Sequence, residues 1–180
     1  MFASQEMLNL VAKQLAMLAS EQVHRLAEAV TGRDDYSDDV TGTVLSFMPH
    51  IIEKAIITSP SIPADVGVLL CAKFLNDFEA IVKITANAVG FSNPIKKAWF
   101  NIGFSKMFRG EYDVMKPKFN KLWEAARFDQ ADPLDFIALV VLKRAEAASG
   151  NPLDNNRNRE SAGQAVSELF AKVHSIIEGS

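Results

Sequence analysis

The sequence predicts an all-α fold, a single-domain bundle of about seven helices. No segment alternates polar and apolar residues with the period of two that a half-buried strand shows. Apolar residues instead recur at spacings of three and four, and glycine and proline fall between the recurring segments. With 180 residues, 48% of them hydrophobic and 23% charged, the chain has the length and composition of one globular domain, residues 1–180.

The first two predicted helices cover about residues 4–31 and 38–58. Gly32 ends the first helix, and the apolar positions of the second continue across Pro49, where we expect a kink rather than a break. The first helix also carries an apolar seam of the kind that a partner helix covers, and a homodimer through this helix is therefore a hypothesis. The seam consists of Leu8, Val11, Leu15 and Leu18.

Three further helices are predicted in the middle of the chain. The third covers about 62–89 and is apolar over a broad arc of its circumference. The fourth covers 94–109 and is ended by Gly110. The fifth covers about 113–128, with Pro117 in its first turn, where proline is tolerated.

The last two helices are predicted at 133–149 and 160–178. Asp132 and Pro133 begin the sixth, which is apolar at seven successive positions, and a polar linker at about 149–159 precedes the seventh. Helices apolar on most of their circumference are typical of the middle of a bundle. We therefore predict that the third, fourth and sixth helices are central.

Charge is unevenly distributed along the chain. The net charge is −3, whereas residues 94–127 contain eight cations and three acids, a net charge of +5. Aromatic residues beside cations are typical of protein interfaces, and cations with stacking aromatics are also typical of nucleic-acid binding. The candidate partner-binding residues are Lys97, Trp99, Lys106, Arg109, Lys116, Lys118 and Lys121.

The loop after the first helix is acidic, with aspartates at Asp34, Asp35, Asp38 and Asp39. The stretch DDYSD is similar in spacing to the DDxxD motif of isoprenoid synthases, and that resemblance implies carboxylates that hold magnesium ions. Such enzymes place the motif on a helix, and many carry a second acidic motif. Here the stretch lies in a predicted loop without a second copy, so we interpret it as an exposed loop in which Ser37 caps the second helix. It could contact a basic partner.

Two histidine–glutamate pairs have a spacing seen in metal-binding bundles: Glu21 with His24, and His50 with Glu53. On a helical wheel both pairs lie far from the apolar face of their helix, so we predict solvent-exposed histidines and no metal site. Cys71 falls on an apolar arc and is interpreted as a small buried hydrophobic residue. The predicted inward faces are almost purely apolar, which argues against a catalytic site.

These observations predict a non-enzymatic, cytoplasmic protein of the adaptor or inhibitor type, which binds another protein through surface patches and needs no cofactor. The single cysteine, the absence of a signal-like start, and a longest uncharged stretch of only 13 residues (40–52) are the reasons for the compartment and for expecting no membrane span. The first alternative is a helical subunit associated with nucleic acid. The second is a pocket for an apolar ligand between the third, fourth and sixth helices.

Overall fold

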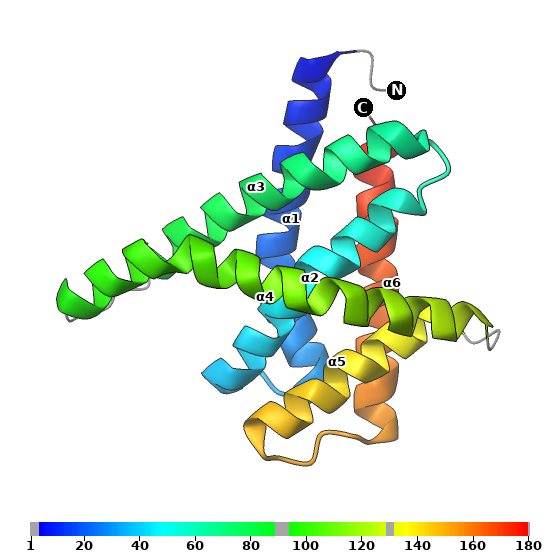
Figure 1. Ribbon diagram of the computed structural model, residues 1–180. Coiled ribbons are helices and arrows are strands. Elements are labelled where there is room, and N and C mark those ends of the chain that lie inside the picture. The colour runs from blue at the N-terminus through cyan, green and yellow to red at the C-terminus, as the bar shows by residue number, and fades with distance from the viewer. Residues whose placement is uncertain (1–3, 89–93, 129–131, 180) are drawn as a thin grey trace.

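The computed structural model describes residues 4–88, 94–128 and 132–179, with side chains for 4–85, 103–127 and 132–179. These residues form six α-helices and no strand, which confirms the predicted all-α fold. They pack into one compact body (Figure 1). The helices are α1 (Gln5–Thr31), α2 (Asp38–Ile57), α3 (Ala64–Ala88), α4 (Pro94–Phe128), α5 (Pro133–Ser149) and α6 (Asn156–Glu178).

The predicted number of seven helices is wrong because α4 is one continuous helix where two were expected. Gly110 lies inside α4, and so does Pro117. A glycine that ends a helix commonly adopts a positive φ, and among the described glycines only Gly32 and Gly150 do so, at 69° and 73°. Gly110 thus lacks the backbone conformation that ends a helix, and the helix continues through it.

The central helix is α2, which contacts all five other helices. Figure 1 shows α4 crossing over α2, while α1 and α6 run along the body behind it. Residues 47–52 of α2 are all buried, so the helix is covered on every side at its middle. The prediction that the 94–109 segment is central is wrong, because it belongs to a helix on the outside of the body, where Met107 is 73% exposed.

Among the described residues, α2 is also the one helix long and apolar enough, by length and composition, to cross a membrane. The core helix of a soluble protein passes the same test. In α2, 56% of the apolar stretch is buried inside the protein, where it is surrounded by the other five helices. The arrangement is therefore that of a core helix.

Most predicted helix ends coincide with capping residues. Ser4, Asp132 and Asn155 precede α1, α5 and α6, and each side chain accepts a hydrogen bond from a backbone N–H two or three residues later, at 2.8–3.2 Å. Gly32 ends α1 as predicted. Ser37 occupies the N-cap position of α2, but its side chain makes no capping hydrogen bond.

The polar segment 149–159, predicted as a linker, is partly helical, because α6 begins at Asn156, four residues earlier than the predicted start. The turn before α6 is held in place by acidic side chains. The Glu146 carboxylate accepts hydrogen bonds from two backbone N–H groups of this turn at 2.8 and 2.9 Å. The Asp154 carboxylate forms ion pairs with Lys143 and Arg159.

The apolar seam of α1 is covered by the chain itself. Leu8, Val11 and Leu15 are at most 4% exposed, and α1 packs against α3, α6 and α2. These three residues therefore offer no surface to a second copy, and the fourth, Leu18, is half-buried against the core. The observation that motivated a homodimer through this helix therefore no longer supports it.

Candidate functional site

The largest departure from the predicted surface is His50, which is 2% exposed rather than solvent-exposed. Its ring stacks on Tyr112 and Phe119 of α4, at centroid distances of 4.8 and 5.5 Å. Burial, with Lys116 and Lys54 nearby, lowers the pKa of His50 to about 4, so the ring is neutral at pH 7. The prediction that this histidine faces water is wrong because α4 covers the side of α2 that the helical wheel assigned to solvent.

Glu53, one turn after His50, is also largely enclosed. Its carboxylate accepts a hydrogen bond of 2.5 Å from the Tyr112 hydroxyl. Burial raises the pKa of Glu53, and burial followed by the hydrogen bond to Glu53 raises the pKa of Tyr112. The backbone carbonyl of Glu53 lies 4.0 Å from the thiol of Cys71, which is half-buried as a small apolar side chain would be. The prediction of an almost purely apolar interior is therefore wrong between α2 and its neighbours α3 and α4.

These groups line an open cleft of about 500 Å³, here named the α2–α3–α4 cleft. Each helix contributes one stripe of side chains, spaced mostly by three or four residues, as one face of a helix requires. The lining residues are His50, Glu53, Lys54 and Ile57 of α2, Val68, Cys71, Ala72, Leu75 and Asn76 of α3, and Arg109, Tyr112, Lys116, Phe119 and Asn120 of α4.

The two sides of this cleft differ in character. The α3 side is mostly apolar, and Ile57 at the end of α2 continues that apolar surface. The opposite side carries the cations of α2 and α4. Lys54 lies over the ring of Trp123, 5.6 Å from its centroid, and Lys116 lies over the ring of Tyr112 at 5.5 Å. A molecule in the cleft would therefore meet apolar side chains on one side and positive charge on the other.

The potentially reactive groups of the cleft are either held in an unreactive form or enclosed by other side chains. Burial raises the pKa of Cys71 to about 12, and the nucleophilic form of cysteine is the thiolate. The hydroxyl of Tyr112 is already donated to Glu53. The neutral ring of His50 is enclosed between two aromatic rings. This arrangement suits binding better than covalent chemistry.

The predicted partner-binding residues do not share one surface. The side chains of Lys97 and Trp99 lie outside the described residues. Arg109 and Lys116 line the cleft, and Arg109 is paired with Glu79 at 2.9 Å. The other three, Lys106, Lys118 and Lys121, are exposed on α4 but do not line the cleft.

The predicted acidic loop is exposed at all four aspartates, Asp34, Asp35, Asp38 and Asp39. Asp35 pairs with Arg33 at 3.0 Å, and Asp38 and Asp39 stand in the first turn of α2. Within the described part of the chain, no group of three or more metal-ligating side chains comes together, which leaves the DDxxD-like stretch without a second set of ligands. His24 is exposed, as predicted, and bonds the Tyr36 hydroxyl.

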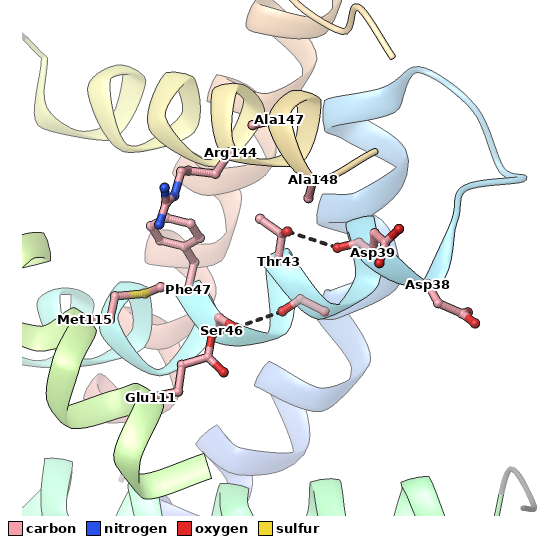
Figure 2. Close-up of a pocket in the computed structure, with 11 residues that line it drawn as sticks. Asp38, Asp39, Thr43, Ser46, Phe47, Glu111, Met115, Arg144, Ala147 and Ala148 are labelled. Atoms are coloured by element: carbon pink, nitrogen blue, oxygen red, sulfur yellow. Dashed lines mark hydrogen bonds between the residues drawn. The ribbon is translucent and has the colours of Figure 1, made fainter. Parts of the chain in front are cut away.

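A second groove, of about 560 Å³, lies between α2, α4 and α5 (Figure 2). Its hydroxyl groups are used within the protein: Thr43 donates to the carbonyl of Asp39 at 2.9 Å, and Ser46 bonds the Glu111 carboxylate at 2.8 Å. Figure 2 shows the Asp38 side chain pointing away from Arg144 on the far side of the groove. The hydroxyl groups of this groove are therefore already engaged within the protein.

No protein-family model matches this chain, and no curated protein or solved structure matches it.

Sequence reasoning missed the cleft residues of α2 because it assigned their face to solvent. One signal was available. One stripe of α2 combines an imidazole, an acid, a cation and a large apolar residue: His50, Glu53, Lys54 and Ile57. Isoleucine is among the residues most often buried, so its presence in this stripe indicates that the stripe is not fully exposed to solvent. The matching stripe of α4 could be found only by treating 94–128 as one helix.

Proposed function

We propose that this protein is a non-enzymatic binding protein that takes a segment of a partner protein into the α2–α3–α4 cleft. The observation that supports this proposal is the pairing of an exposed apolar wall with a charged wall in one concavity. Ile57 and Val68, on neighbouring helices, both line the cleft and are 50% and 66% exposed. Burying a large aliphatic side chain fully is worth about 1.5–3 kcal/mol, so covering these half-exposed ones would contribute about 1–2 kcal/mol each.

A protein segment fits these walls better than the two alternatives. A purely apolar ligand would leave the charged side chains of Lys54 and Lys116 without a carboxylate partner. Nucleic acid would need cations gathered along one surface, whereas Lys118 and Lys121 lie away from the cleft and Arg109 is engaged with Glu79. A peptide chain can supply apolar and polar side chains together.

The experiment selects peptides that bind the full chain from a random display library. It then measures which of these peptides need the cleft for their affinity. The test variant is Val68→Gln, which replaces part of the apolar wall with a neutral polar side chain. The matched control is Val114→Gln on α4, because Val114 is 61% exposed and does not line the cleft. Both variants should fold normally, since exposed substitutions usually change stability by about 0.5 kcal/mol or less.

We expect the selected peptides to bind about tenfold more weakly to the Val68→Gln variant and equally well to the Val114→Gln variant. Peptides that lose affinity equally on both variants, or on neither, would contradict binding in the cleft. Unchanged melting temperatures for both variants show that the loss is local.

A further inference from the structure

The cleft carries more positive than negative charge. Its charged lining residues are Lys54, Arg109 and Lys116 against the single acid Glu53. Arg109 is already used, since it pairs with Glu79 at 2.9 Å and bonds Asn76. The two lysines are different: among the described residues, neither ammonium has a carboxylate within ion-pair distance.

Glu53 compensates the two lysines only in part. Its carboxylate is turned to the Tyr112 hydroxyl, which donates to it at 2.5 Å. Burial lowers the pKa of Lys54. The negative charges of Glu124 and Glu53 oppose this shift, whereas the charge of Lys116 adds to it, so the two ammonium groups are close enough to repel each other. An anion brought between them would relieve that repulsion, as oppositely charged groups do across interfaces.

A second observation points to an occupant of the cleft. His50 lines the cleft although it is only 2% exposed. Its Nε2 has no hydrogen-bond partner among the described residues. A buried polar atom without a partner costs about 1–3 kcal/mol, and such atoms are uncommon in folded proteins. A polar group delivered into the cleft, with a small movement of the rings beside His50, would satisfy it.

We infer that the cleft recognises an acidic side chain of the partner protein, a carboxylate held between Lys54 and Lys116 next to an apolar side chain that packs on Val68 and Leu75. This inference rests on the proposed function and names the chemistry of the bound segment. Lysine ammonium groups on flexible stems can approach a carboxylate from two sides, while the aromatic rings under them keep each lysine at the cleft.

The test compares one cleft-dependent peptide from the display experiment with its analogue in which the acidic residue is replaced by the amide, aspartate by asparagine or glutamate by glutamine. Affinity for both peptides is measured by calorimetry on the wild type, on the Lys116→Met variant and on the Lys118→Met variant. Lys118 is the matched control because it lies two residues along the same helix, is exposed and does not line the cleft. Methionine keeps helix propensity and removes the charge.

We expect the wild type to prefer the acidic peptide by about five- to tenfold at low salt, the preference to shrink as salt is added, and the Lys116→Met variant to lose most of it. The Lys118→Met variant should keep the preference. If the peptides depend on Val68 but bind equally in acid and amide form, the inference is overturned while the proposed function stands. If no peptide depends on Val68, both are overturned. Selected peptides that depend on Val68 but contain no acidic residue would also overturn it.

Discussion

Acid should destabilise this protein through one buried histidine. His50 is 2% exposed, and its pKa is lowered from 6.5 to about 4, with burial as the main cause. At about 1.4 kcal/mol per pH unit, the difference corresponds to about 3 kcal/mol of stability. For a domain whose total free energy of unfolding is about 5–15 kcal/mol, that is a large share.

The direction follows from which state binds the proton first. As pH falls below about 6.5, the imidazole of the unfolded chain becomes protonated while that of the folded chain stays neutral, so the unfolded state gains stability. The loss is complete near pH 4, where the folded state also binds the proton. Glu53 acts in the opposite sense, because burial raises its pKa, so the histidine must be isolated by comparison with a variant.

The assay is urea denaturation of the wild type and of the His50→Phe variant at several pH values from about 7.5 to about 4. Phenylalanine keeps a ring between Tyr112 and Phe119 and does not titrate. We expect the stability of the wild type relative to this variant to fall by about 3 kcal/mol over that range. If the larger phenylalanine ring does not fit, the His50→Leu variant serves instead, and the stability of the wild type relative to it should change with pH in the same way. The matched control is His24→Phe, which changes an exposed histidine. The stability of this variant should fall with pH as much as that of the wild type. A difference between the wild type and His50→Phe that stays constant with pH would refute the reasoning.

Further predictions concern three glycines, each measured by chemical denaturation. The Gly150→Ala change should cost about 1 kcal/mol, because Gly150 has a φ of 73° but an added Cβ would meet nothing within 4 Å. The Gly32→Ala change should cost about 2–4 kcal/mol, because it adds to a φ of 69° a 2.6 Å contact with Oδ1 of buried Asn158; equal costs for the two would contradict this geometry. The Gly110→Ala change should stabilise by about 0.5–1 kcal/mol, because Gly110 is helical and exposed, and destabilisation there would mean that the chain turns at this residue.

The fold class and most helix ends could be predicted from the sequence because they depend on local chemistry. A capping side chain acts on backbone groups two or three residues away, so Asp132 and the glycine at position 32 could be interpreted without knowing the packing. The start of α6 was misplaced for a related reason: the segment before residue 160 is polar, and only its hydrogen bonds with Glu146 and the Asn155 cap show that it turns directly into the helix.

The continuity of α4 could not be predicted in the same way, because glycine inside a helix costs only about 1 kcal/mol. Packing can offset that amount. Tyr112, Phe119 and Trp123, all after Gly110, are buried against the rest of the protein, and Phe104 and Phe108 before it are partly buried. One continuous helix satisfies both groups of contacts, whereas a turn at Gly110 would have directed the second group elsewhere.

The missed cleft follows from that single error. A helical wheel assigns a face to solvent when the face is polar and no partner helix is known to cover it. With α4 divided in two, Tyr112 fell between the predicted helices and no helix was assigned to the polar face of α2, so His50 and Glu53 were placed in water. With α4 continuous, the same face becomes the floor of a concavity, because α4 reaches across α2 with Tyr112 and Phe119 while leaving the apolar side of α3 open. The residues most suited to recognise a partner are therefore those whose polarity made them look like ordinary surface, and their environment depends on a helix that begins 44 positions after His50 in the sequence.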